Sequence, residues 1–241
     1  MYPYFYGFDP TVILLIPAMI LAFVAQGQVQ RNFRRYSQVR AASGLTGAQA
    51  ARRMLDANGL QNVQIVPISG QLTDHYDPRN RTVSLSQGVY DSSSVSAVSV
   101  ACHECGHAVQ HARNYAPLTI RNSIVPVVNF ASSISWILIM VGLMMIFAGS
   151  AQSTSTLGNT IFNAGVLCFV AVVLFHLITL PVEFNASRRG LESIREMGFV
   201  SPDEYGGARA VLRAAAMTYV AALAMAAANL LRILAIRGRR D

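Results

Sequence analysis

The chain has 241 residues, of which 53% are hydrophobic and only 13% are charged. An ordinary soluble domain has about 25% charged residues, so the composition excludes a typical soluble protein and favours a membrane protein with a small polar part. The net charge of +7 comes from arginine alone, because the chain has no lysine, and no nucleic-acid-binding motif accompanies it. We therefore expect the lipid bilayer, and not nucleic acid, as a partner.

The three cysteines are Cys102, Cys105 and Cys168. An odd number without a framework spacing argues against a disulfide scaffold. We interpret all three as small buried residues.

The first apolar stretch runs from Thr11 to about Gln26, and no charged residue occurs between Asp9 and Arg31. A secretory signal peptide is the alternative, but the residues before the stretch include Asp9 and neither Arg nor Lys. We predict that residues 1–26 form a retained transmembrane helix, with Pro17 as a candidate position for a kink.

A polar region follows over residues 27–123. Thr46 is typical of a helix N-cap, and Gly59 marks the end of the helix that follows it. Further along, the pattern predicts a strand over 64–68, a turn over 77–80, a strand over 82–85 and a helix over about 92–111. We therefore expect a small cytoplasmic α+β part that is attached to the membrane at both ends.

The 61 residues between Arg121 and Glu183 contain no charged side chain. A break of small and polar residues interrupts this run at about 150–159, and each flank has the roughly 20 residues that a spanning helix needs. The pattern predicts a transmembrane hairpin over 124–182, with its helices at about 124–148 and 160–182.

The last region, residues 183–241, contains an alanine-rich stretch between Arg213 and Arg232. Alanine permits close helix packing in lipid, so this stretch either spans the membrane or is buried within the protein. We expect it to span, which gives about four transmembrane helices in an α-helical membrane protein.

Arginines cluster after the first and the third apolar segments, at Arg31, Arg34, Arg35 and Arg40 and at Arg188, Arg189 and Arg195. Such clusters are typical of cytoplasmic flanks, so we expect a multi-pass protein of the cell membrane with both clusters inside. One feature disagrees, because a fourth spanning helix would place Arg237, Arg239 and Arg240 outside.

The chemistry centres on the pentapeptide His103-Glu104-Cys105-Gly106-His107. Residues i and i+4 share one face of a helix, so His103 and His107 can bind one Zn²⁺. Glu104, next to the first histidine, is placed to act as the general base toward a water at the metal. A chance motif on an exposed helix is the alternative.

A zinc hydrolase needs a third protein ligand. The residues that could supply it are Glu183, Glu192, Glu196, His111, His176 and His75. Glu183 ends the uncharged run, where a carboxylate is costly unless it is paired or bound to a cation. Pairing with Arg188 explains it equally well on sequence grounds, and His176 fits either an interior histidine or a site residue.

Three stretches of the chain carry a resemblance to a known family: residues 74–78, residues 103–110 and residues 180–187. With them, nearly the whole chain resembles the membrane zinc metallopeptidases of the neutral zinc protease type, also called the YugP-like family. Its layout is similar to that of the gluzincin group of membrane proteases, which includes HtpX. In that group a Glu-x-x-Ala-Asp motif after a membrane hairpin supplies the third ligand and an aspartate that supports a ligand histidine.

The resemblance implies that Glu183 is the third ligand of a single Zn²⁺ in a zincin-like fold. Ser187 stands at the position of the supporting aspartate; serine can still hydrogen-bond a ligand but supplies no charge. In zinc peptidases with this order of elements, a strand such as Thr82, Val83, Ser84 and Leu85 is an exposed sheet edge that binds substrate backbone. We also expect His75 to stabilise the oxyanion of the transition state, although an ordinary turn residue is the alternative.

These expectations together describe a membrane-embedded zinc endopeptidase that acts on peptides or on membrane and membrane-proximal proteins. The main alternative is a non-catalytic membrane adaptor or quality-control protein that retains the zinc site, against which the intact Glu104 argues. A transporter would need more ionisable groups at membrane depth than His176 alone. No feature of the sequence defines an oligomeric state.

Overall fold

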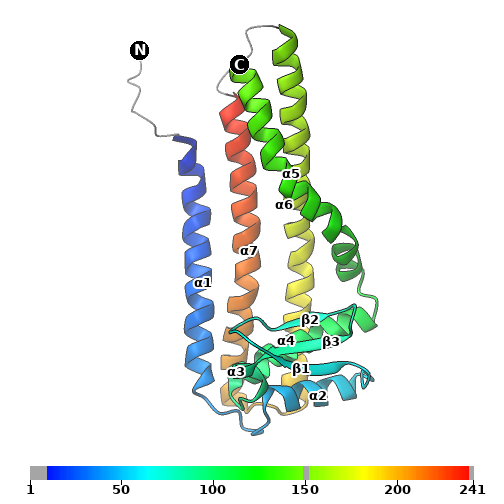
Figure 1. The fold of residues 1–241 in the computed structure, drawn as a ribbon. Helices are drawn as coiled ribbons and strands as arrows, with labels where there is room; N and C mark the ends of the chain where they lie inside the picture. The colour runs from blue at the N-terminus through cyan, green and yellow to red at the C-terminus, as the bar shows by residue number, and fades with distance from the viewer. Residues whose placement is uncertain (1–9, 149–151, 239–241) are drawn as a thin grey trace. The chain divides into compact units, whose positions relative to one another are not determined.

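The computed structural model describes residues 10–148 and 152–238. The elements, labelled as in Figure 1, are η1 (Pro10–Leu15), α1 (Ile16–Ser37), α2 (Gly47–Ala57), β1 (Gln64–Ile68), β2 (His75–Asp77), β3 (Thr82–Ser86), α3 (Gln87–Tyr90), α4 (Val95–Ala112), α5 (Ala116–Ala148), α6 (Gln152–Glu196) and α7 (Pro202–Gly238). Arg239 and Arg240, two of the arginines that a fourth spanning helix would place outside, lie beyond the described residues.

Four helical segments are long and apolar enough to cross a membrane: Pro10–Ser37, Ala116–Phe147, Thr154–Glu196 and Pro202–Arg237. This confirms the prediction of a helical membrane protein with about four membrane helices. The predicted kink at Pro17 is absent, because α1 begins at Ile16 after the 3₁₀ turn η1. Pro17 thus lies in the first turn of α1, where a missing N–H costs no helical hydrogen bond.

Contacts divide the chain into two compact units, each of which is described by itself. The first contains the described residues up to Phe23, residues Ser123–Leu177 and the chain from Ala221 onward. The second contains Val24–Asn122 and Ile178–Val220. The four regions predicted from the sequence were divided by hydropathy, whereas these two units are divided by contacts. The boundaries of the four regions therefore remain predictions.

The first unit has a small apolar core and an apolar surface. Ile139 of α5, Phe162 and Phe169 of α6 and Ile233 of α7 are buried against one another. Other large apolar side chains point outward; Phe130, Met144 and Leu167 are each about 70% exposed. An apolar exterior of this kind is what helices facing lipid require.

The second unit contains the α+β part, whose helices begin and end where the sequence predicts. Thr46 caps α2 with a reciprocal capping box to Gln49, and Gly59 follows the helix with φ of +74°. Ser94 caps α4 by accepting a hydrogen bond from the Ala97 N–H. These contacts satisfy backbone groups that a helix end otherwise leaves unpaired.

The three strands form one sheet in the order β1-β3-β2, with β3 parallel to β1 and antiparallel to β2. The prediction that Thr82–Leu85 is an exposed edge is therefore wrong. These residues form the middle strand, and Val83, Ser84 and Leu85 are buried. The sheet edges are β1, which carries Pro67, and β2.

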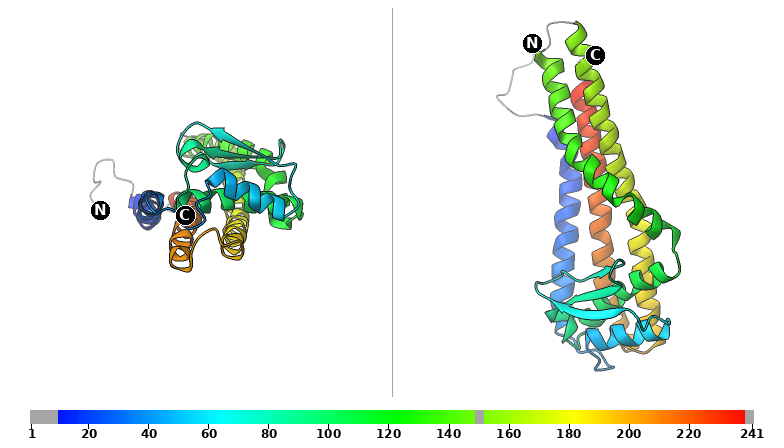
Figure 2. Two further views of the ribbon diagram at one scale, coloured as in Figure 1. Left: turned by 90° about the horizontal axis from the view of Figure 1, so that it is seen from below. Right: turned by 45° about the vertical axis from the view of Figure 1, so that its right-hand side comes forward.

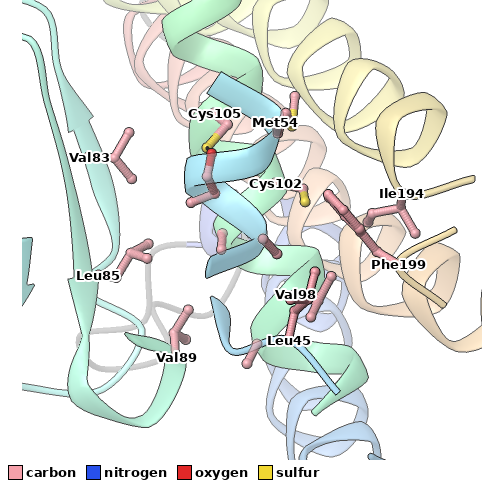
Figure 3. Packing of buried hydrophobic residues seen from close by; sticks show 14 of the residues in the cluster. Leu45, Met54, Val83, Leu85, Val89, Val98, Cys102, Cys105, Ile194 and Phe199 are labelled. Atoms are coloured by element: carbon pink, nitrogen blue, oxygen red, sulfur yellow. Dashed lines mark hydrogen bonds between the residues drawn. The ribbon is translucent and has the colours of Figure 1, made fainter. Parts of the chain in front are cut away.

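The core of the second unit lies between the sheet and the helices α2 and α4, which cover the same face of the sheet (Figures 2 and 3). Val83 and Leu85 point from β3 toward Met54 of α2 and toward α4 (Figure 3). Cys102 and Cys105 are fully buried in this core, as predicted, whereas Cys168 is partly exposed. Burial raises the pKa of both core thiols, so they stay neutral and are poor metal ligands.

Candidate metal centre

The helix α4 presents two imidazoles on one face. His103 and His107 are four residues apart, and their rings lie 4.8 Å apart, centroid to centroid, at an interplanar angle of 85°. Both side chains are about 90% buried, and each points its Nε2 atom toward the same carboxylate. The i, i+4 spacing therefore converges on one point, as the motif predicts.

The helix α6 supplies that carboxylate because it passes very close to α4 at Gly106. A Cβ atom at Gly106 would lie 2.5 Å from the backbone oxygen of Ala186, so no other residue fits without displacing a helix. Glu183 and Ser187 lie within one turn of Ala186 and thereby reach His107 and His103. The glycine between the two histidines thus sets the approach of the third group.

The three side chains His103, His107 and Glu183 could hold one metal ion, because their ligand atoms all lie within 4.8 Å of one another. Oε2 of Glu183 is 3.4 Å from Nε2 of His103 and 3.5 Å from Nε2 of His107. Ligands at about 2.0–2.2 Å around a tetrahedral zinc are separated by about 3.3–3.5 Å.

The surroundings of the Glu183 carboxylate indicate that it needs a further partner. Its side chain is only 2% exposed, and its Oε2 atom is buried without a hydrogen-bond partner among the described residues. A buried carboxylate oxygen is costly unless a hydrogen bond or a cation compensates it. A zinc ion at the convergence point would supply that compensation, so the residues present fit the metal.

Burial would by itself lower the pKa of His107, but the close contact of its ring with the charged Glu183 carboxylate outweighs this effect and raises the pKa. The metal-free pair is therefore held together by charge. A zinc ion would take the place of this shared proton.

Each histidine is oriented through its second ring nitrogen. Nδ1 of His103 is 3.1 Å from Oγ of Ser187, and Nδ1 of His107 donates to Oε1 of Gln110 over 3.0 Å. These contacts leave each Nε2 free to face the metal position. Ser187 thus lies where the resemblance implied.

Gln110 is a supporting residue that the sequence did not single out. It is fully buried, and its Nε2 donates to the carbonyl of Val182 over 2.8 Å and to Oδ1 of Asn185 over 3.0 Å. Asn185 Oδ1 also accepts a hydrogen bond from Nε of Arg189. The amide of Gln110 therefore joins His107 of α4 to the backbone of α6. The spacing of three residues between His107 and Gln110 is the sequence signal that could have identified Gln110.

A cavity of about 150 Å³ opens at the three convergent side chains. Glu104 lines it together with Arg121, Asn122, Tyr219 and His75. Nη1 of Arg121 is 3.9 Å from Oε1 of Glu183, and Tyr219 lines the cavity beside this pair. The cavity thus combines a carboxylate, a permanent cation and several hydrogen-bond donors beside the candidate metal position.

Arg121 and Tyr219 were missed by the sequence reasoning. Arg121 precedes the uncharged run that Glu183 ends, and an antiparallel hairpin returns its two ends to one place. The position of Arg121 at the opposite end of this run from Glu183 could therefore have identified it. Tyr219 lies in an alanine-rich stretch without any motif, so no sequence signal distinguishes it.

The structure places the remaining candidates outside the ligand group. Arg188, the alternative partner of Glu183, instead pairs with Glu192 over 3.8 Å on the surface. His111 accepts or donates a hydrogen bond with the Tyr76 hydroxyl over 2.8 Å, and His176 lies in the other unit against Phe175. Among the described residues, the cluster that could hold a metal contains neither these histidines nor Glu196.

His75 does line the cavity, at the start of the edge strand β2. Its Nδ1 lies 2.9 Å from the backbone oxygen of Thr73, to which it donates, and Nε2 is left for another partner. Tyr76 also lines the cavity, with its hydroxyl engaged by His111. Thr82, Val83, Ser84 and Leu85 do not line it.

Known proteins resemble this chain over almost its full length. The family described as "Putative neutral zinc metallopeptidase" matches residues 11–238. A relative in Bacillus subtilis (strain 168), described as "Putative membrane protease YugP", is 48% identical over 225 residues, which cover 93% of this chain and 95% of the relative. No solved structure matches. On this evidence, and with a buried His-His-Glu group that fits one zinc ion, the chain belongs to the neutral zinc metallopeptidase family.

Proposed function

We propose that the protein is a membrane-embedded, zinc-dependent endopeptidase of the gluzincin type, which hydrolyses peptide bonds of membrane or membrane-proximal proteins. One observation carries the proposal: within the part of the chain that the structure describes, the buried Oε2 of Glu183 has no hydrogen-bond partner, and it lies about equally far from the Nε2 atoms of His103 and His107. His103, His107 and Glu183 are then the three zinc ligands.

Bound zinc would lower the pKa of a water and polarise the carbonyl of the scissile peptide bond. Glu104, which follows the first histidine and lines the cavity, takes the proton of the attacking water as general base. It then carries this proton to the leaving amine. Glu104 is 8% exposed and needs no bond to the metal for this role.

The negative charge that develops on the carbonyl oxygen needs donors at the open side of the metal position. His75 remains our candidate, and its Nε2 can donate only in the protonated ring because Nδ1–H is held by the Thr73 carbonyl. Arg121, which is always charged, is a second candidate in the same cavity.

An extended substrate could add to the sheet at β2. This strand lies at an edge of the sheet, where it is hydrogen-bonded to β3 along one side. It contributes His75 and Tyr76 to the cavity. Backbone pairing at an edge binds peptides with little regard to their side chains. The substrate-binding strand is thus proposed to be β2 in place of Thr82–Leu85.

The substitution Glu104→Gln tests the proposal. It should abolish hydrolysis, because an amide cannot accept the proton of the water, and it should leave the zinc content near that of the unmodified protein. Proteomics of intact membranes that contain either form, together with metal analysis, measures both effects. Proteins whose fragments disappear in the mutant are its substrates. The same fragments with both forms would refute the mechanism, and the absence of fragments with both forms would favour the adaptor.

A further inference from the structure

A second cavity, of about 300 Å³, adjoins the metal centre on the side of α1 and α7. It shares Asp74, His103, Glu104 and Tyr219 with the smaller cavity described above. The two cavities therefore meet at the general base, and any group held in either one lies beside the reacting atoms.

Most of the residues that line the second cavity are apolar, and Gln26 and Thr218 add polar groups to those that it shares with the smaller cavity. Val29 and Phe33 of α1, Val100 of α4 and Val211, Leu212 and Ala215 of α7 line it. At its mouth lies Leu72, which is 42% exposed and has a φ of +55°. A leucine rarely adopts that conformation, so the loop before β2 holds an apolar side chain over the cavity at a conformational cost.

The charged groups of this cavity are already engaged. The Asp74 carboxylate accepts hydrogen bonds from the N–H and the hydroxyl of Ser86, at 2.7 and 3.1 Å. Glu104 is the proposed base, and no arginine lines the cavity. An acidic side chain would find no arginine there, and the carboxylate that a basic one would meet is the proposed base.

The smaller cavity differs, because Arg121, Asn122 and His75 make it polar. A cavity of about 150 Å³ suffices to hold a benzene ring, so the larger one accommodates a leucine or phenylalanine side chain. The two cavities at the metal position thus differ in polarity and in volume.

We propose that the cavity between α1, α4 and α7 is the specificity pocket of the peptidase, which takes a large apolar side chain of the residue next to the scissile bond. This inference rests on the proposed function and names its substrate class: peptides with leucine, phenylalanine or a similar residue at the cleavage site. Binding in such pockets discriminates roughly 10–200-fold per methylene group.

The test uses peptide hydroxamates, whose zinc-binding group reports binding without turnover. The full-length, zinc-loaded protein is titrated calorimetrically with compounds that carry glycine, leucine, phenylalanine, lysine or glutamate on either side of the hydroxamate. We expect the leucine and phenylalanine compounds to bind at least tenfold more tightly than the glycine compound in one of the two series. Equal affinities, or tighter binding of lysine or glutamate, would overturn the proposal.

Two variants locate the preference. Ala215→Leu fills the cavity and should remove the preference for leucine and phenylalanine while the glycine compound binds as before. Phe33→Ala enlarges the cavity at a half-buried position and should shift the preference toward larger aromatic groups. The matched control Ala210→Leu adds the same bulk on α7 beside a different cavity and should change nothing. An unchanged preference in both Ala215→Leu and Phe33→Ala would place the side chain elsewhere.

A peptide library cleaved by the same preparation separates this inference from the proposed function. Cleavage without an apolar preference would overturn the pocket and keep the peptidase. Absence of cleavage with apolar hydroxamate selectivity that Ala215→Leu removes would support the pocket and contradict the peptidase.

Discussion

The side chains at the two ends of the uncharged run between Arg121 and Glu183 both lie at the metal centre. Glu183 provides a carboxylate oxygen that lacks a hydrogen-bond partner, and Arg121 brings a permanent positive charge to 3.9 Å from the other oxygen of that carboxylate. Ser187 and Gln110 hold the histidines through Nδ1. Each of these contacts links a ligand to a neighbour, so their removal should affect zinc binding in graded steps.

The first prediction of this kind concerns Glu183. Glu183→Ala should lower the zinc affinity by more than the roughly 10–100-fold that loss of a supporting hydrogen bond costs, and Ser187→Ala should fall within that range. Zinc titration against a competing chelator measures both, and the matched control Glu192→Ala, an exposed carboxylate that pairs with Arg188, should bind as before. Normal zinc binding by Glu183→Ala would show that the third ligand lies elsewhere.

A second prediction concerns His75, which is exposed on β2 and lines the cavity. If it stabilises the oxyanion, His75→Ala should lower kcat roughly 10²–10³-fold with retained zinc content and fold. Measurement of kcat, zinc content and thermal unfolding for the two proteins checks this; a loss of stability, or no effect, would assign a structural role.

Between elements, the decisive contact is the crossing of α4 and α6. Gly106 and Gly190 both lie where a Cβ atom would meet the backbone of the facing helix, at 2.5 Å from Ala186 and at 3.1 Å from Cys102. This close approach brings Glu183 to the two histidines. Metal binding in turn ties α4 to α6 and should stabilise the contact.

The third prediction follows from this crossing. Gly106→Ala should destabilise the protein by about 1–3 kcal/mol, because the added methyl overpacks the contact, and should weaken zinc binding by displacing Glu183. The matched control is Gly206→Ala in α7, where no atom lies within 4 Å of the added Cβ; it should be stabilising by up to about 1 kcal/mol. Thermal unfolding in detergent, with and without zinc, distinguishes the two. Equal behaviour of both variants would contradict a tight crossing.

On the scale of the entire protein, both arginine clusters belong to the unit that carries the metal centre. Arg31, Arg34 and Arg35 lie in α1, and Arg188, Arg189 and Arg195 lie in α6. Since arginine flanks mark the cytoplasmic side, we propose that the site faces the cytoplasm. Arg237 lies in the other unit and hydrogen-bonds Asn163, so a spanning α7 would break the arginine rule at the C-terminus.

Orientation is tested by cysteine accessibility in intact cells. The native Cys168 is partly exposed and is first replaced by serine, whereas Cys102 and Cys105 are buried. Cysteines introduced at Arg35 and Arg188 should react only when a membrane-impermeant reagent reaches the cytoplasmic side, and Ser153→Cys should react from outside. Reaction of Ser153→Cys from the cytoplasm alone would invert the proposed topology.

Local physics determined much of this protein from the sequence alone. Hydropathy gave the four membrane helices, Thr46 and Gly59 gave the limits of α2, and helical periodicity placed His103 and His107 on one face. These features depend on residues within a few positions of one another, so a sequence pattern contains them. Glu183 needed the family resemblance to be preferred over its alternatives.

Only the tertiary structure decided which distant residues meet. The sequence pattern of Thr82–Leu85 predicts a half-buried strand but not its position in the sheet. Its place in the middle depends on pairing with both β1 and β2. Gln110, Arg121 and Tyr219 reach the site because the four helices α4, α5, α6 and α7 converge on it, and no local pattern encodes that convergence. The apolar cavity likewise has walls from three helices. Packing joins residues far apart in the chain, whereas periodicity is a property of neighbours. This is why the sequence identified the two histidines but not Gln110, Arg121 or Tyr219.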